Sequence, residues 1–171
     1  GPIINQTSLD RLNVHITKLK TDKEFIECDK NCSEDGYFVK PIAFKINNIS
    51  EIDGEKFGPI LHFISYKTED LDKILEEVNA TGFGLTMGVH SRITEKANKI
   101  FEKAKIGNFY LNRDIVGAVV GVQPFGGQGL SGTGPKAGGP NYLKSFVTEK
   151  TFTDNVMATG GNIDLLNKNN Q

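Results

Sequence analysis

The stretch GNFYLNRDIVGAVVGVQPFGGQGLSGTGPKAGG, residues 107–139, is the most informative part of this chain for its fold. Nine of the chain's 19 glycines lie between Gly117 and Gly139. Glycine has no Cβ, so a backbone this rich in it can turn sharply, adopt positive φ and approach other groups closely. Such a backbone is typical of a binding loop. We expect the flanking sequence to form the regular structure that holds this loop in place.

The flanking sequence shows alternating helical and strand patterns. Apolar residues recur at intervals of three and four in the helical segments, whereas short runs rich in β-branched and aromatic residues mark the strands. The predicted helices are Thr7–Lys20, Thr68 to the residue before Gly82, and Thr94 to about Lys105, and the predicted strands are Phe25–Cys28, Tyr37–Ile46, Ile60–Tyr66, Leu85–His90 and Gly107–Leu111.

Several details of these elements can be predicted from single residues. Thr68 and Thr94 are expected to be N-caps, since their hydroxyls can accept hydrogen bonds from free helical N–H groups. Phe101 is expected on the buried face of its helix. Pro41 has no N–H to donate, so it should confine its strand to a sheet edge or break the strand in two.

Strands that alternate with helices at these spacings predict the α/β class, with an open α/β sheet joined by helical crossovers. Ligands in such sheets bind beyond the carboxyl ends of the strands. The loop from Arg113 to Gly139 follows the last of these strands, so it is the expected binding site.

Composition narrows the classes of partner. The 171 residues carry 20 basic and 21 acidic side chains, and the formal net charge is −1. This balance gives no electrostatic reason to expect nucleic acid or an anionic membrane as a partner. No apolar run approaches the roughly 20 residues of a spanning helix, and the N-terminus lacks a signal-peptide pattern. We expect a cytoplasmic protein that binds a small molecule or another protein.

The cysteines and histidines do not predict a metal centre. Cys28 and Cys32 stand close together in the polar stretch CDKNC, but no histidine lies near them in the sequence and a structural zinc site needs four ligands. A thiol pair or half of a metal site is the less favoured interpretation. His62 lies inside a predicted strand and is expected to be a hydrogen-bonded structural residue.

Gly127–Gly132 matches G-x-G-x-x-G, the pattern of a dinucleotide-binding turn. In that fold the pattern opens a helix whose N-terminus holds the pyrophosphate. Here it is followed by TGPKAGGP, whose prolines and glycines cannot start a helix. We therefore reject the dinucleotide-binding interpretation of this hexapeptide.

The loop could instead bind an anion through backbone N–H groups, with Val119, Val120 and Phe125 shielding the contact from water. The alternative is that the glycines merely let the loop cross a neighbouring element. A second candidate site is the segment Glu55–Pro59, where a carboxylate and a ring stand two residues apart. They could contact a sugar and a flat heterocycle.

Four ordered motifs together resemble the aldehyde dehydrogenase superfamily: E-x-F-G-P at Glu55–Pro59, T-G-F-G-L-T at Thr81–Thr86, G-N-x-x-x-N at Gly107 to Asn112, and P-F-G-G-x-x-x-S-G at Pro124–Gly132. The stretch VGAVVGVQPFGGQGLSGTGPKAGGPNYL is similar to the Δ1-pyrroline-5-carboxylate (glutamate semialdehyde) dehydrogenase branch, especially the C-terminal half of bifunctional proline utilization A proteins. The resemblance runs from Gly1 to about Phe152, and NVMATGGNIDLL is also similar to the extreme C-terminus of that branch.

This resemblance implies NAD-dependent oxidation of glutamate γ-semialdehyde to glutamate through a thioester on a catalytic cysteine. It assigns Glu55 to the nicotinamide ribose and Phe57 to the nicotinamide side. It assigns the N–H groups of Gly117 and Ala118 to the substrate's α-carboxylate. Phe125 would form an aromatic wall of the aldehyde tunnel.

The resemblance also implies what these residues lack. In the family the catalytic cysteine, the general base, the oxyanion-hole asparagine and the Rossmann units all precede E-x-F-G-P, and neither Cys28 nor Cys32 lies in a nucleophile motif. We therefore expect a C-terminal enzyme fragment that is inactive alone, because no thioester forms without the nucleophile.

The expected domain organisation has three parts: residues 1–141 as a partial catalytic domain, 142–153 as an oligomerisation strand and 154–171 as a tail. Tyr142–Phe152 alternates apolar and polar residues, which predicts an edge strand able to pair with another chain. This indicates a homo-oligomer or a complement of an upstream enzyme portion. The alternative function is a non-catalytic partner that assembles with an intact dehydrogenase through this strand.

Overall fold

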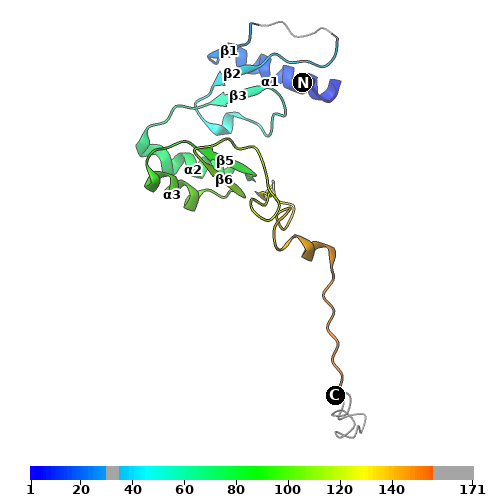
Figure 1. Ribbon diagram of the computed structural model, residues 1–171. Coiled ribbons are helices and arrows are strands. Elements are labelled where there is room, and N and C mark those ends of the chain that lie inside the picture. Colours follow the sequence, from blue (N-terminus) through cyan, green and yellow to red (C-terminus); the bar gives the residue numbers. More distant parts are fainter. Residues whose placement is uncertain (30–34, 156–171) are drawn as a thin grey trace, which may run out of the picture.

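The computed structural model describes residues 1–29 and 35–155, and these form an α/β fold in two layered parts (Figure 1). The helices are α1 (Gln6–Lys20), α2 (Leu71–Ala80) and α3 (Thr94–Lys103). Three short 3₁₀ helices are η1 (Ile49–Glu51), η2 (Thr68–Asp70) and η3 (Tyr142–Phe146). The strands are β1 (Phe25–Glu27), β2 (Ile42–Lys45), β3 (Ile60–Phe63), β4 (Phe83–Gly84), β5 (Thr86–Val89), β6 (Asn108–Leu111) and β7 (Gln128–Gly129).

The first part packs α1 on a three-stranded sheet ordered β1-β2-β3. β1 runs antiparallel to β2, and β3 runs parallel to it. Phe44 is fully buried in the centre of β2, where it packs with Leu19 and Ile42. Burying these apolar side chains between helix and sheet supplies the main stabilising free energy of this part.

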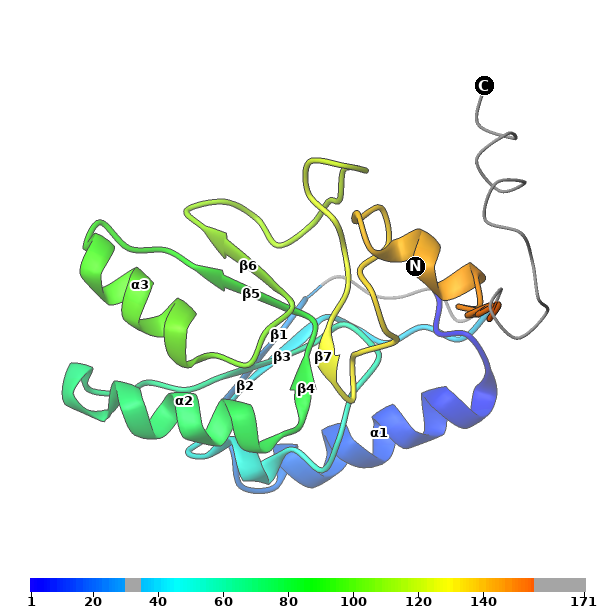
Figure 2. The ribbon, with the colours of Figure 1, turned by 90° about the horizontal axis from the view of Figure 1, so that it is seen from below.

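The second part is built from β5, α3 and β6, with α2 beside them (Figure 2). β5 and β6 are parallel and are joined through α3, which is the crossover that the sequence predicted. Leu71 and Leu75 of α2 meet Ile100 of α3 in a second buried cluster, against which Phe109 of β6 packs.

The α/β class is therefore confirmed, with its strands divided among three small sheets in the described residues. The third sheet is the short antiparallel pair β4-β7, which joins the turn after α2 to the glycine-rich loop. That loop leaves the carboxyl end of β6, where the sequence analysis placed the site.

Four local predictions are wrong. β2 is the central strand of its sheet, because it begins one residue after Pro41 and so needs no N–H from the proline. Thr68 and Thr94 are not caps: Thr68 opens η2, Thr94 is the first residue of α3, and neither helix start has a side-chain cap hydrogen bond. Phe101 is 61% exposed, although its ring contacts Phe109.

The predicted strand Tyr142–Phe152 is also wrong over its first half, which forms η3. Tyr142 and Phe146 stack edge-to-face at 5.3 Å, a contact that one helical turn brings about. Residues 147–155 have no strand partner among the residues that the structure describes, so their pairing with another chain stays a prediction. Cys32 and the segment 156–171 lie outside the described residues.

Candidate functional site

The glycine-rich loop contains a tight turn, Val116–Val119, which we call the anchor turn. Three of its N–H groups can be compared with their neighbours. The N–H of Val116 donates to Asp114 Oδ1 at 3.3 Å, and that of Val119 donates to the carbonyl of Gln123 at 3.0 Å. Among the described residues, the N–H groups of Gly117 and Ala118 have no acceptor. Both residues are exposed, so two adjacent donors are available to a ligand.

The backbone and its neighbours fix the shape of the anchor turn. Gly117 has a φ of 109°, a conformation that favours glycine. The carbonyl of Val116 accepts from Arg113 Nη2 at 2.9 Å. The carbonyl of Gly117 accepts from Gln123 Nε2 at 2.9 Å and from the Tyr110 hydroxyl at 3.1 Å. Adjacent N–H groups held in this way form an anion-binding concavity.

Phe125, the third predicted substrate residue, is half-buried further along the same loop. Its backbone pairs in both directions with Ala137, at 3.0 and 2.8 Å. The buried side chain of Asn108 donates to the carbonyl of Pro124 and accepts from the N–H of Gly126, so it grips the residues on either side of Phe125. Lys136 Nζ contacts the Gly107 carbonyl and closes the loop onto the start of β6.

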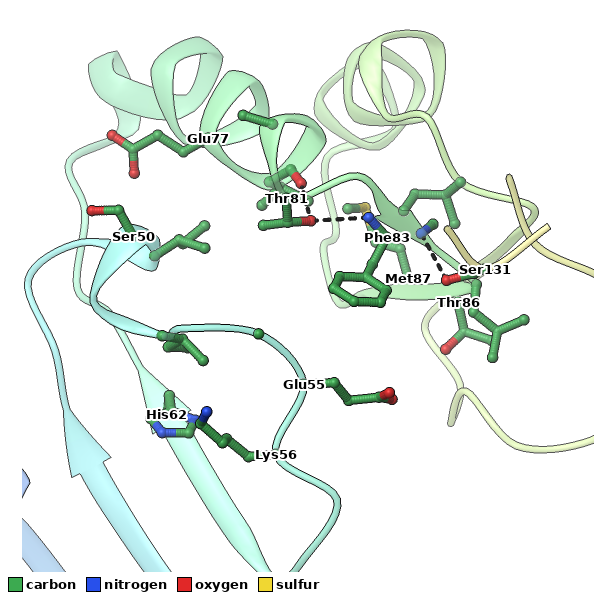
Figure 3. Close-up of a pocket in the computed structure, with 18 of the residues that line it drawn as sticks. Ser50, Glu55, Lys56, His62, Glu77, Thr81, Phe83, Thr86, Met87 and Ser131 are labelled. Carbon is green, nitrogen blue, oxygen red and sulfur yellow. Dashed lines mark hydrogen bonds between the residues drawn. The ribbon is translucent and has the colours of Figure 1, made fainter. Parts of the chain in front are cut away.

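A separate pocket of about 740 Å³ lies between the two parts of the chain (Figure 3). Its walls are the segment around η1 and the loop before β3 on one side, and the end of α2 with the turn Thr81–Met87 on the other. Ser131 closes one end by accepting a hydrogen bond from the N–H of Gly84 at 3.1 Å. Figure 3 shows Glu55 reaching from its loop toward Thr86.

The structure separates the two predicted cofactor residues. Glu55 is exposed and lines the pocket, whereas Phe57 is 86% exposed and does not line it. Neither side chain has a hydrogen-bond or ion-pair partner among the described residues. An unpaired carboxylate can accept two ribose hydroxyls and an uncovered ring can pack on a heterocycle, so both residues fit the nicotinamide end of NAD chemically.

The hexapeptide Gly127–Gly132 forms β7 and a turn, and no helix follows until η3. It provides no helix N-terminus to hold a pyrophosphate, so the structure agrees with our rejection of the dinucleotide-binding interpretation. Within residues 1–29 and 35–155, no group of three or more metal-ligating side chains occurs, and no helix is long and apolar enough to cross a membrane. Cys28 is half-buried and free.

His62 also lines the pocket, and it has the structural role that the sequence predicted. Its Nε2 lies 2.9 Å from Nε2 of His15, a buried residue of α1. Burial is the largest cause that lowers the pKa of each ring, and the positive charge of Lys56 is the next. The sequence analysis missed His15, although its position three residues after Leu12 placed it on the buried face of α1.

The sequence analysis also missed the supports of the loop: Tyr110, Arg113, Gln123, Asn108 and Lys136. Asn108 stood in the quoted G-N-x-x-x-N pattern, so the motif itself was a signal. The roles of Arg113 and Gln123 could not be found in the sequence, because they depend on the loop folding back on itself.

The arrangement after β6 defines a class of protein. The sequence profile of the aldehyde dehydrogenase family matches residues 1–152. This chain therefore belongs to the aldehyde dehydrogenase family.

Within the family, the chain is similar to two kinds of protein. It is 47% identical over 150 residues to the bifunctional protein PutA of Rhizobium meliloti, a match that covers 86% of this chain and 12% of that protein. It is 36% identical over 156 residues to the 1-pyrroline-5-carboxylate dehydrogenase of Bacillus pumilus, covering 90% of this chain and 30% of that one. The chain thus spans less than a third of the length of either relative.

Solved structures give the same result. A crystal structure of bifunctional proline utilization A aligns with a TM-score of 0.81 at 47% identity, over 94% of this chain and 16% of that one. The 1-pyrroline-5-carboxylate dehydrogenase from Thermus with bound NAD aligns with a TM-score of 0.75 at 38% identity, over 85% of this chain and 28% of that one.

Proposed function

We propose that these residues form the substrate-anchoring part of an NAD-dependent 1-pyrroline-5-carboxylate dehydrogenase, which oxidises glutamate semialdehyde to glutamate. One observation carries the proposal: two adjacent N–H groups, of Gly117 and Ala118, are free in a chain whose relatives include proteins with that name. A carboxylate is a strong acceptor for such a pair of donors. An acidic aldehyde would bind there through its carboxylate.

Each residue group then has a separate task. Gly117 and Ala118 would hold the carboxylate and so fix the distance of the aldehyde from the reacting centre. Phe125 would shield the aldehyde chain from water. Glu55 and Phe57 would orient the nicotinamide end of NAD, which accepts the hydride from the aldehyde carbon when it is bound. Holding both reactants in place lowers the entropic part of the barrier.

The nucleophile must come from outside these tasks, since neither Cys28 nor Cys32 lies in the family's nucleophile motif. We propose that the 171 residues alone do not oxidise aldehydes. They act within what we call the assembled dehydrogenase, in which they are joined to, or reconstituted with, the part that bears the catalytic cysteine.

The assay that tests this proposal measures NADH formation. The assembled dehydrogenase should oxidise glutamate semialdehyde in preference to pentanal, an aldehyde of the same length without the carboxylate. The 171-residue chain should form no NADH with either aldehyde. NADH formed by the chain alone, or equal rates of the assembled enzyme on both aldehydes, would contradict the proposal.

A second candidate function is favoured by the exposure of the segment after the loop. Leu143, Phe146, Val147 and Phe152 are each at least 70% exposed, and Figure 1 shows this segment leading away from the rest of the fold. Such apolar side chains are typical of an interface. We propose that residues 142–153 pair with another chain, in a homo-oligomer or as a non-catalytic partner of an intact dehydrogenase.

Size-exclusion chromatography tests this second candidate. The protein should elute as an oligomer, and removal of residues 142–155 should shift it to the monomer. Co-elution of the chain with intact dehydrogenase would favour the non-catalytic role. Elution as a monomer in both cases would rule out the interface.

A further inference from the structure

The direction of the two free N–H groups follows from the hydrogen bonds of the anchor turn. In a trans peptide, the C=O and the N–H of one unit point in opposite directions. The described chain has no cis peptide bond. Fixing a carbonyl oxygen therefore also fixes where the N–H of the next residue points.

Both carbonyl oxygens that matter are fixed from one side. The unit that carries the Gly117 N–H has its oxygen, that of Val116, bonded to Arg113. The unit that carries the Ala118 N–H has its oxygen, that of Gly117, bonded to both Tyr110 and Gln123. The two N–H groups must consequently point away from these three side chains.

The three side chains also order one another. Arg113 Nη1 donates to Gln123 Oε1 at 3.2 Å. A guanidinium has only donors, so it turns the amide oxygen of Gln123 toward itself and leaves the amide NH₂ for the carbonyl of Gly117. The guanidinium carbon of Arg113 also lies 5.0 Å from the centre of the Tyr110 ring, a cation–π contact. Asp114 Oδ1, 3.3 Å from Arg113 Nη2, partly balances the charge.

We propose that Tyr110, Arg113 and Gln123 form a brace that aims the N–H groups of Gly117 and Ala118 at the substrate's carboxylate. The brace sets the preference of the enzyme for acidic aldehydes. Its members are positioning residues that act through the backbone. Arg113 adds a second effect, because a cation bonded to the Val116 carbonyl polarises the peptide and strengthens the Gly117 N–H as a donor. This inference rests on the proposed function.

The experiment compares Tyr110→Phe and Gln123→Met variants of the assembled dehydrogenase with the wild type. Each variant removes one hydrogen bond to the Gly117 carbonyl and keeps most of the side-chain volume. Loss of one such bond should raise KM for glutamate semialdehyde about tenfold, with kcat changed less than about twofold and KM for pentanal unchanged. The Kd for L-glutamate, measured by calorimetry without turnover, should rise by the same factor.

Two further variants separate aiming from charge and from general damage. Arg113→Lys keeps the cation but loses the fork that bonds Val116 and Gln123 together, so its KM for the semialdehyde should rise as well. Tyr66→Phe is the matched control for Tyr110→Phe, because Tyr66 is exposed and its hydroxyl has no hydrogen-bond partner in the described part of the chain. Its kinetics should equal those of the wild type.

The outcomes distinguish the brace from the proposed function. A wild type that prefers the semialdehyde, with brace variants that retain the full preference, would overturn the brace alone. Variants that lose activity equally on both aldehydes, together with a lower melting temperature, would show a purely structural role and also overturn it. A wild type without any preference would overturn the proposed function first.

Discussion

His15 and His62 meet through their Nε2 atoms at 2.9 Å, so in the neutral pair one nitrogen donates and the other accepts. Burial lowers the pKa of both rings below the ordinary value of 6.5, and Lys56 adds to the effect on both. Lys18 also disfavours a charge on His15, while Asp53 favours it. The pair therefore links α1 to β3 best when both rings are neutral.

This pair predicts a pH dependence of stability. Unfolded histidines ionise near 6.5, whereas the folded rings resist protonation, so below that pH the unfolded state binds more protons. The free energy of unfolding should be insensitive to this pair above about pH 7 and should fall as the pH drops through about 6. Urea unfolding of the wild type and of His62→Phe across this range measures the effect. Parallel stability curves for the two proteins would contradict it.

The element scale explains why glycine stands where the motifs require it. A Cβ on Gly84, in β4, would lie 2.3 Å from the carbonyl oxygen of Lys105. A Cβ on Gly107, at the start of β6, would lie 1.9 Å from the carbonyl oxygen of Gly126. Both contacts are with backbone atoms, which cannot swing aside. The glycines thus let the loop lie directly against the sheet strands.

Gly107→Ala should consequently detach the loop from β6. We expect a destabilisation of about 2–4 kcal/mol, the range typical of overpacking against backbone. Gly54→Ala is the control: Gly54 has a φ of 88° but nothing within 4 Å of the added Cβ, so only backbone strain of about 1 kcal/mol is expected. Equal costs for the two substitutions in denaturant unfolding would contradict the steric explanation.

The elements themselves could be predicted where one periodicity dominates. Leu12 and Leu19 mark the buried face of α1, and the expected helix matches the observed one within a residue. The segment after Asn141 was misread because Tyr142 and Phe146 stand four residues apart. That spacing satisfies both a strand and a helical turn, and no local signal separates the two.

At the scale of the whole molecule, the sequence located the loop but not the contacts that shape it. The family motifs pointed to Gly117, Ala118 and Phe125, all of which lie on the loop after β6. The pocket beside Glu55 could not be predicted by periodicity, since residues 48–62 and 77–87 meet only in the folded chain. The brace was missed for the same reason.

The central claim is that the N–H groups of Gly117 and Ala118 select acidic aldehydes. The most direct measurement is the ratio of kcat/KM for glutamate semialdehyde to that for pentanal, in the assembled dehydrogenase with and without Ala118→Phe. The added ring should obstruct the anchor turn, and loss of two charge-assisted hydrogen bonds should lower the ratio about a hundredfold, with pentanal little affected. A ratio unchanged by the substitution would contradict the claim.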